Sequence, residues 1–327
     1  MDFTPSDEQN IIRDSARRLF ERECGVELLH AAWADPAASL PLWRDHLVDW
    51  LSLAEQPLAD TVFFLEEYGR AAVPGPFFSA LLAALLRCIG NMDEHTPAAI
   101  ALGDAAGEWV SGDQAYAYVA GLEQLERVLL VSGSAAAPRV ALVACADCSI
   151  TPIEHLDQLR PQYRLALQNN AEWSDLPPAD WEKAYRAMLV CAAAELTGVA
   201  RYLLEAALQY AGEREQFGQP IGSFQGLQWQ LVDAASGLER AAAAVGYAAM
   251  CADAVDADAQ RAAHIAKLEA GAAARHCARV SLQVHGGIGY TWERGLHYWL
   301  RRAYAGDAFL GNTDFHTRRL GELLFAA

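Results

Sequence analysis

Apolar residues recur every three to four positions in the first part of the chain, a spacing that predicts helices. The first helix opens at Thr4, which can cap it with Pro5 in the first turn. The other predicted helices of this part cover Leu40–Leu53, Leu58–Ala72 and Phe77–Ile89. The pattern indicates an all-helical N-terminal domain over residues 1–96.

The middle of the chain consists of short apolar or alternating runs separated by Gly, Pro and Asp, which is typical of strands. The predicted strands are Ala98–Leu102, Glu108–Val110, Ala115–Val119, Arg127–Ser132, Arg139–Ala144 and Tyr163–Leu167. They predict a short, β-barrel-like domain over residues 97–175, with the polar, proline-bearing stretch Asn169–Pro178 as a linker.

The helical spacing returns in the last part of the chain, over residues 176–327. The predicted helices are Asp180–Tyr210, a second that starts behind Ser223, Ala259–Val284, and Trp292–Phe325 with a possible interruption at Gly311. Four long helices of this kind are expected to pack as an antiparallel bundle. The predicted fold class is therefore mainly α with a small β domain.

The junction between the first two helices of this bundle is rich in polar chemistry. Gly218 can adopt the left-handed conformation that ends a helix, and Pro220 cannot continue one. Ser223 can cap the next helix. The gap leaves the guanidinium of Arg214, several amides and an aromatic ring, a set that suits a flat, anionic ligand.

Composition excludes several classes of partner. The formal net charge is −17, which makes nucleic acid an unsuitable partner and disfavours anionic membrane surfaces. No basic, apolar leader is visible at Met1–Phe20, and no apolar run reaches the roughly 18 residues of a membrane span. The seven scattered cysteines fit a reducing, cytoplasmic setting with free thiols.

Cys145 and Cys148 have the spacing of redox and zinc sites. No second cysteine pair follows, however, and the preceding residues resemble a strand rather than the entry to a redox helix. We interpret the pair as two small residues at a strand end, and the sequence predicts no metal site.

Several blocks of the C-terminal half occur in one order that resembles the acyl-CoA dehydrogenase family. These blocks are Arg214–Gly218, Pro220–Gln225, Ala266–Lys267, Gln283–Tyr290, Thr291–Glu293 and Leu300–Arg302, followed by His316 and Arg318–Leu320. The N-terminal half is similar in a looser way. The similar stretches are Met1–Thr4, Leu65–Arg70, Ala98–Asp104, Gly107–Gly112 and Arg127–Val131.

The resemblance implies a helical domain, a β domain and a four-helix bundle, with an FAD lying across a subunit interface. By the family pattern, Arg214 contacts the FAD pyrophosphate, and Phe217 and Gln225 touch its adenosine side. The segment from Gln283 to the pair Gly286 and Gly287 closes over the flavin of a partner subunit. The resemblance also implies an acyl-CoA substrate and an electron-transfer flavoprotein as electron acceptor.

The family uses a carboxylate to abstract the proton α to a thioester carbonyl, and this sequence departs from the pattern there. The usual Glu precedes a Gly-Thr pair in the last helical region, where this chain has Leu310 or Gly311, depending on how one extra residue is placed. Some members carry the base in the first bundle helix instead. The substitute candidates are Asp307, Glu195 and Glu182.

The β domain departs from the family pattern as well. Its acidic, Gly-rich turn and its Trp-x-Ser/Thr strand beside the flavin have no counterpart, and the connection Gly112–Gly121 is short. The chain thereby resembles the short, base-less subunit of heteromeric acyl-CoA dehydrogenases, some of which act on steroid side chains.

Three hypotheses follow. The chain is the base-less subunit of an FAD-dependent acyl-CoA dehydrogenase completed by a longer homologous subunit. Alternatively, it is a self-sufficient dehydrogenase, acting with copies of itself, whose base is Asp307, Glu195 or Glu182. A third hypothesis is a scaffold that kept the fold and lost the flavin. The presence of bound flavin in the protein alone, or only with a longer homologue, discriminates between them.

Overall fold

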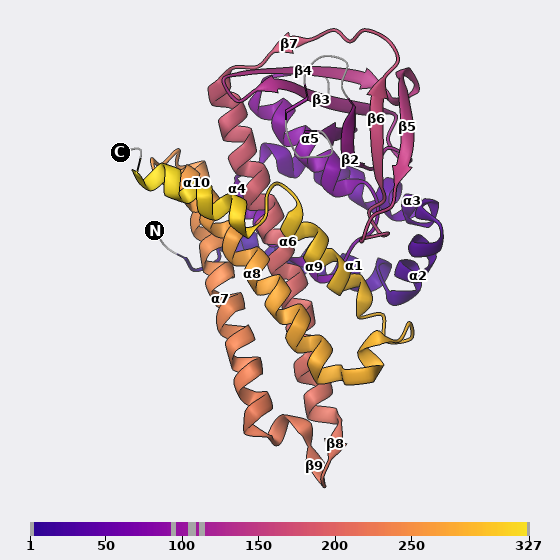
Figure 1. The fold of residues 1–327 in the computed structure, drawn as a ribbon, viewed down its shortest axis with the longest axis vertical. Coiled ribbons are helices and arrows are strands. Elements are labelled where there is room, and N and C mark those ends of the chain that lie inside the picture. The colour runs from indigo at the N-terminus through magenta and orange to yellow at the C-terminus, as the bar shows by residue number, and fades with distance from the viewer. Residues whose placement is uncertain (1–2, 93–95, 104–108, 111–114, 326–327) are drawn as a thin grey trace. The chain divides into compact units, whose positions relative to one another are not determined.

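The computed structural model describes residues 3–92, 96–103, 109–110 and 115–325 of the chain. The predicted strand Glu108–Val110, the block Gly107–Gly112 and the connection Gly112–Gly121 lie in part outside these residues. The structure is mostly helical with a small β region, as predicted (Figure 1).

Contacts divide the chain into two compact units. Unit 1 comprises Met1–Val26, Leu58–Val73 and Leu189–Ala327, and unit 2 comprises Glu27–Pro57 and Pro74–Met188. This grouping does not test the predicted boundaries at residues 1–96, 97–175 and 176–327, which stay a prediction. Each unit is described by itself.

Unit 1 is built from long helices. They are α1 (Asp7–Glu23), α4 (Leu58–Arg70), the second half of α6 (Pro178–Glu213), α7 (Gln225–Asp253), α8 (Ala259–His285), the short turn η6 (Gly286–Tyr290), α9 (His297–Ala308) and α10 (Thr313–Phe325). The predicted interruption near Gly311 is confirmed, since α9 and α10 are separate helices.

Two predicted caps are wrong. Helix α1 is capped by Ser6, not Thr4, because Ser6 and Gln9 form a reciprocal capping box in which each side chain bonds the other's backbone amide. Helix α7 is not capped by Ser223. Residues Ile221–Ser223 form their own short 3-10 turn (η5), so the helix begins one residue later than predicted, behind Phe224, without a side-chain cap.

Helices α7 and α8 run antiparallel beside one another (Figure 1). Small residues line their buried faces, including Ala234, Ala241 and Ala248 on α7 and Ala263, Ala270 and Ala274 on α8. Alanine side chains let two helix backbones approach closely and exclude water from the seam. The alanine surplus of the sequence is thus used in helix–helix contact.

Helices α4 and α6 cross at two glycines. A Cβ placed on Gly69 would lie 2.0 Å from the carbonyl oxygen of Glu195, and one on Gly198 would lie 1.8 Å from that of Glu66. An ion pair of 2.5 Å between Arg201 and Glu66 adds to this crossing.

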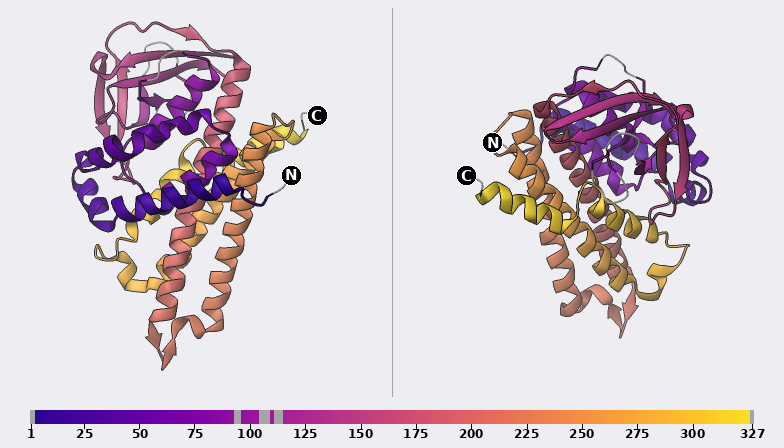
Figure 2. Two further views of the ribbon diagram at one scale, coloured as in Figure 1. Left: turned by 180° about the vertical axis from the view of Figure 1, so that it is seen from behind. Right: turned by 45° about the horizontal axis from the view of Figure 1, so that its top comes forward.

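Unit 2 carries two small sheets and several short helical segments. The first sheet has the order β1 (Ala98–Ala101), β3 (Arg127–Ser134), β4 (Ala137–Ala144) and β7 (Ser174–Asp175). Strand β1 pairs parallel to β3 and the other neighbours pair antiparallel. The second, antiparallel sheet has the order β2 (Tyr116–Ala120), β6 (Gln162–Leu167) and β5 (Cys148–Ile153). Figure 2 shows the long β3–β4 hairpin from two further sides.

Five of the predicted strands are confirmed with small shifts at their ends. Strand β5 was not predicted from the sequence, and neither was the two-residue β7, which lies inside the predicted linker Asn169–Pro178. Trp109 and Val110 are described and do not lie in a strand. Neither strand order closes on itself in the described part of the chain, so the barrel-like description is not confirmed.

The helical segments of unit 2 are α2 (Val26–Ala34, entered from unit 1), η1 (Pro36–Ser39), α3 (Leu40–Leu42), η2 (Trp43–Leu47), η3 (Val48–Glu55) and α5 (Phe77–Ile89). The predicted helix Leu40–Leu53 is therefore replaced by a series of short segments with α, π and 3-10 hydrogen-bond spacing. Helix α5 is almost entirely buried and packs on β1 and η3.

Helix α6 is long and apolar enough to cross a membrane by length and composition alone, which qualifies the expectation that no such stretch exists. In the structure, 89% of its most apolar window is buried inside the protein. Burial of that kind is what a core helix requires.

The α4–α6 crossing predicts a sharp difference between two glycines of α6. Gly198→Ala should cost about 1–3 kcal/mol of unfolding free energy, because its methyl group collides with the backbone of α4. Gly212→Ala should be neutral or stabilise by up to about 1 kcal/mol, since no atom lies within 4 Å of that position and alanine favours helix. Urea unfolding measures both, and equal stabilities of the two variants would contradict the close crossing.

Candidate functional site

The junction after α6 folds into a small hairpin rather than a simple break at Gly218. The helix ends at Glu213, and β8 (Glu215–Gln216) pairs with β9 (Gln219–Pro220). Phe217 and Gly218 at the tip have φ values of 53° and 78°, the paired positive values that a two-residue hairpin turn requires. The glycine therefore serves a hairpin and not the helix end that the sequence suggested.

Three of the predicted cofactor-binding residues lie at the hairpin corner, which is the segment Arg214–Gln225. Arg214 and Gln225 are exposed, and Phe217 is 95% exposed with its ring edge-on to that of Phe224. Within the described ranges, no carboxylate forms an ion pair with Arg214. A guanidinium, an amide and an aromatic ring are thus all available to a ligand or to another protein surface.

The other three predicted cofactor-binding residues lie at the end of α8. Gln283 is exposed, and Gly286 ends the helix with a φ of 60°, its amide donating to the carbonyl of Leu282. No atom lies within 4 Å of a Cβ built on Gly286 or Gly287, whereas one on Gly289 would meet His285 and Leu282 at 3.0 and 3.1 Å. Internal packing therefore explains Gly289 but not Gly287, which leaves backbone open to close approach by an outside group.

Two stacked aromatic rings connect the hairpin corner to the end of α8. Tyr210, one turn before Arg214, stacks on His285 at a centroid distance of 4.7 Å. The Nδ1 atom of His285 lies 2.8 Å from the carbonyl oxygen of Ser281, and its Nε2 atom lies 3.1 Å from Nη2 of Arg294. The structure thus brings the hairpin corner and the end of α8 together, through two residues to which the sequence assigned no cofactor-binding role.

The fit of these residues to FAD can be judged from their chemistry. A dinucleotide needs a fork for phosphate oxygens, backbone that a phosphate or ring can approach, and groups to contact the adenosine. Arg214, the pair Gly286 and Gly287, and the side chains of Phe217 and Gln225 supply these functions. The donor set fits the adenosine diphosphate part of the cofactor.

The position of the usual base lies elsewhere, in the link between α9 and α10. Leu310 and Gly311 have φ values of 59° and 108°, and neither brings a carboxylate. Lys267 donates to the carbonyl oxygens of Asp307 and Gly311 at 3.0 and 3.1 Å. His316 donates to the Gly311 carbonyl from Nε2 at 3.1 Å. The link is firmly held although it lacks the family's carboxylate.

Asp307 is buried and already engaged. Its Oδ2 atom lies 3.4 Å from the guanidinium of Arg275, and a Cβ on Gly271 would lie 2.1 Å from its Oδ1 atom. Arg275 also donates to the hydroxyl of Thr313 at 2.7 Å. The carboxylate of Asp307 therefore ties α8 to α9 rather than facing an open space.

The other two carboxylate candidates differ in their surroundings. Glu195 is 3% exposed and pairs at 3.0 Å with Arg302, which is 1% exposed and also donates to the carbonyl of Val73. A pair of this kind is costly to break, because either partner alone is an uncompensated buried charge. Glu182 is an exposed residue of the first turns of α6, in unit 2.

Leu310 and Gly311 are called the base position here, and Arg214, Phe217, Gln225, Gln283, Gly286 and Gly287 the dinucleotide-binding set. The two lie toward opposite ends of α8. Lys267, which holds Gly311, and His285, which stacks on Tyr210, are 18 residues apart in that helix, or about 27 Å along its axis. Within unit 1 these are two separate places.

A pair of buried histidines supports the α9–α10 link. The Nδ1 atoms of His264 and His316 are 2.8 Å apart. Since Nε2 of His316 must carry the proton that it donates to Gly311, the proton between the rings belongs to His264. Burial lowers the pKa of His264 to about 4 and that of His316 to about 3, with Lys267 lowering the latter further. The pair is therefore neutral at pH 7.

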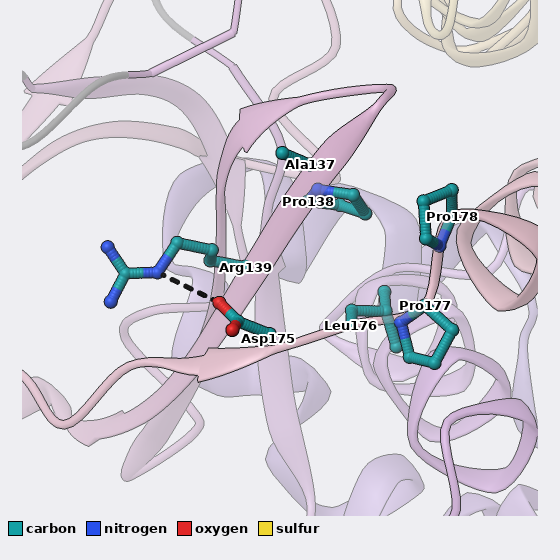
Figure 3. Close-up of a pocket in the computed structure, with 7 residues that line it drawn as sticks. All are labelled: Ala137, Pro138, Arg139, Asp175, Leu176, Pro177 and Pro178. Atoms are coloured by element: carbon teal, nitrogen blue, oxygen red, sulfur yellow. Dashed lines mark ion pairs between the residues drawn. The ribbon is translucent and has the colours of Figure 1, made fainter.

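The remaining features carry no predicted site residue. A pocket of about 380 Å³ in unit 2 is lined by Ala137–Arg139 and Asp175–Pro178, with an ion pair of 3.5 Å between Arg139 and Asp175 (Figure 3). Burial raises the pKa of Cys145 to about 11 and also that of Cys148, so both thiols stay protonated. In the described residues, no cluster of His, Cys, Asp and Glu could hold a metal ion.

Comparison with known proteins identifies the family. Residues 185–325 match the acyl-CoA dehydrogenase C-terminal domain. The chain is 31% identical over 330 residues to the acyl-CoA dehydrogenase IpdE2 of Mycobacterium tuberculosis (strain ATCC 25618 / H37Rv), covering 97% of this chain and 98% of that protein. The chain belongs to the acyl-CoA dehydrogenase family, oxidoreductases that act on CH–CH bonds.

Two solved structures share the fold. The ChsE4-ChsE5 complex from Mycobacterium tuberculosis contains a chain with a TM-score of 0.86 at 20% identity, covering 99% of both chains. A variant of the Tcur3481-Tcur3483 steroid acyl-CoA dehydrogenase gives a TM-score of 0.85 at 23% identity, covering 97% of this chain and 98% of that one.

The histidine pair predicts a specific loss of stability in acid. Both folded pKa values lie below the ordinary value of 6.5, so the unfolded chain binds more protons between about pH 3 and pH 6.5. Stability should fall as the pH drops through this range, by up to about 1.4 kcal/mol per pH unit for each histidine. From pH 7 to pH 5, the wild type should lose roughly 3–4 kcal/mol more than a His264→Asn/His316→Gln double variant.

Urea unfolding at the two pH values measures this difference, and all other titrating groups are shared by the two proteins. Parallel pH dependence in wild type and double variant would show that the pair does not titrate as described.

Proposed function

We propose that the chain is the FAD-binding, base-less subunit of a heteromeric acyl-CoA dehydrogenase, completed by a longer homologous subunit. The observation that carries the proposal is a contrast between two places in unit 1. The dinucleotide-binding set offers an unpaired Arg214 and open backbone at Gly286 and Gly287. The base position holds Leu310 and Gly311 in a fixed link without a carboxylate.

The state of the nearby carboxylates supports the proposal over a self-sufficient enzyme. A general base must reach the proton α to the thioester carbonyl and must be able to accept it. Asp307 and Glu195 are buried in ion pairs with Arg275 and Arg302, where their negative charge is already in use. The base would then come from the partner subunit.

In this assembly each of the predicted cofactor-binding residues has a binding role. Arg214 holds the pyrophosphate, Phe217 and Gln225 contact the adenosine side, and the segment from Gln283 to Gly287 covers the cofactor. FAD, when bound, supplies the acceptor for the β-hydride of the acyl group. The stack of Tyr210 on His285 keeps the two halves of this set in register.

Exposed apolar side chains beside the set support a second subunit there. Phe217, Trp229 and Tyr290 are 95%, 71% and 74% exposed, which is unusual for large aromatic residues unless another surface covers them. A flavin bound at this corner would be enclosed only when a partner packs against it.

The substrate and the further partners follow from the relatives. We infer an acyl-CoA thioester of the fatty acid or steroid side-chain type, oxidised in β-oxidation, because one neighbour in fold is a steroid acyl-CoA dehydrogenase and another is a two-protein complex. An electron-transfer flavoprotein is the expected acceptor, and a cytoplasmic location is expected.

The proposal is tested by the flavin content of the complex formed with a longer homologue. Arg214→Ala should weaken FAD binding by about 10- to 100-fold, because it removes charge-assisted hydrogen bonds to the pyrophosphate. Arg261→Ala is the matched control, since Arg261 is an exposed arginine at the other end of α8, paired with Asp258. Flavin absorbance per chain after gel filtration measures both.

Unchanged flavin content in the Arg214→Ala complex would refute the pyrophosphate assignment. A complex that carries no flavin in wild-type form would leave the scaffold hypothesis in place of the enzyme.

A further inference from the structure

Arg294 follows η6 and is a half-buried cation without a counter-ion. Its Nη2 atom hydrogen-bonds Nε2 of His285 at 3.1 Å, and its Cζ atom lies 6.0 Å from the centroid of the Tyr210 ring. No Asp or Glu of the described chain forms an ion pair with it. Most other half-buried or buried arginines of unit 1 have one, as Arg201 has Glu66 and Arg302 has Glu195.

The two contacts of Arg294 do not neutralise its charge. His285 must donate from Nδ1 to the carbonyl of Ser281, so its Nε2 atom is the bare nitrogen that accepts from Arg294. Burial lowers the pKa of His285, which keeps the ring neutral. Tyr210 offers only the face of a ring, which attracts a cation weakly and carries no formal charge. A partly desolvated charge with such partners is stabilised further by an anion.

A second unpaired arginine is connected to the same tyrosine. The amide of Arg214 donates to the carbonyl of Tyr210 at 2.9 Å, so Arg214 is attached one turn beyond the residue whose ring Arg294 covers. Arg214 is flanked by Glu213 and Glu215. Glu213 accepts a hydrogen bond from Gln209, and neither carboxylate forms an ion pair with Arg214. Arg214 and Arg294 therefore both lack a carboxylate partner in the described residues, although the formal net charge of the chain is −17.

We propose that Arg294 is a second, direct anion-binding residue of this corner and that it takes a pyrophosphate ester together with Arg214. His285 and Tyr210 support the guanidinium, and its remaining N–H groups are the donors for phosphate oxygens. The inference rests on the proposed function insofar as the pyrophosphate is that of FAD. Coenzyme A carries the same group, so the two sources are separated by experiment.

The experiment measures binding of FAD, coenzyme A and inorganic pyrophosphate by titration calorimetry, with the protein alone and in complex with a longer homologue. Arg294→Met should weaken binding of the ligand that uses this corner by about 10- to 100-fold. Arg261→Met, at the far end of α8, should leave it unchanged. If FAD is the source, the loss appears with FAD, and if coenzyme A is the source, it appears with coenzyme A.

A supporting role through His285 is separated from direct contact by His285→Phe. That variant keeps an aromatic ring on Tyr210 and keeps Arg294, so it should lose much less affinity than Arg294→Met. Equal losses in the two variants would overturn direct contact. Thermal unfolding checks that each variant is folded, and Arg294→Gln, which keeps a donor to His285, replaces Arg294→Met if the latter does not fold.

Failure of this inference differs from failure of the proposed function. Wild-type FAD affinity in Arg294→Met, with loss in Arg214→Ala, would overturn the role of Arg294 and leave the flavoprotein intact. Pyrophosphate or coenzyme A binding that depends on Arg294, without any FAD binding, would support the anion site and remove the flavin. Absence of binding of all three probes to the wild type would overturn the inference.

Discussion

The organisation of unit 1 depends on the close packing of α8 within its bundle. The alanine-lined seam with α7 fixes this helix, and both functional places are attached to it. Toward its start, Lys267 and His264 reach the α9–α10 link directly or through His316. At its end, His285 stacks on Tyr210 and so places the hairpin corner beside Gly286. About 27 Å of rigid helix therefore separates the proposed cofactor-binding residues from the position of the base.

The distribution of charge follows the same division. Around the base position three buried charges have partners: Asp307 has Arg275, Glu195 has Arg302, and Lys267 has two carbonyl oxygens. Burial lowers the pKa of Lys267 to about 8, which shows how closed this region is. At the hairpin corner, Arg214 and Arg294 have no carboxylate partner in the described residues. Charges that are satisfied internally hold the fold, and those left unsatisfied are available for a ligand.

Much of the fold was predictable because it is local. The 3.6-residue spacing placed the ends of α4, α5, α6 and α8 to within three residues, and the motif blocks identified the family. Features that depend on distant partners were not predictable. A hairpin at Phe217 and Gly218 stands where a simple helix end was expected. The caps expected at Thr4 and Ser223 are not formed, because Ser6 caps α1 and α7 begins behind Phe224. Lys267 and His316 lay within recognised blocks, but their shared contact with Gly311 joins residues more than 40 positions apart. The engagement of Glu195 by Arg302, 107 positions away, has no local signal at all.

The central claim is that this chain can hold the flavin but cannot take the α-proton of the substrate by itself. Anaerobic titration with an acyl-CoA tests it most directly, with the flavin absorbance followed in the chain alone, reconstituted with FAD, and in its complex with a longer homologue. The account predicts that the flavin bleaches in the complex and stays oxidised in the chain alone. Bleaching of the isolated chain at a comparable rate would contradict the account, because it would require a base among this chain's own carboxylates.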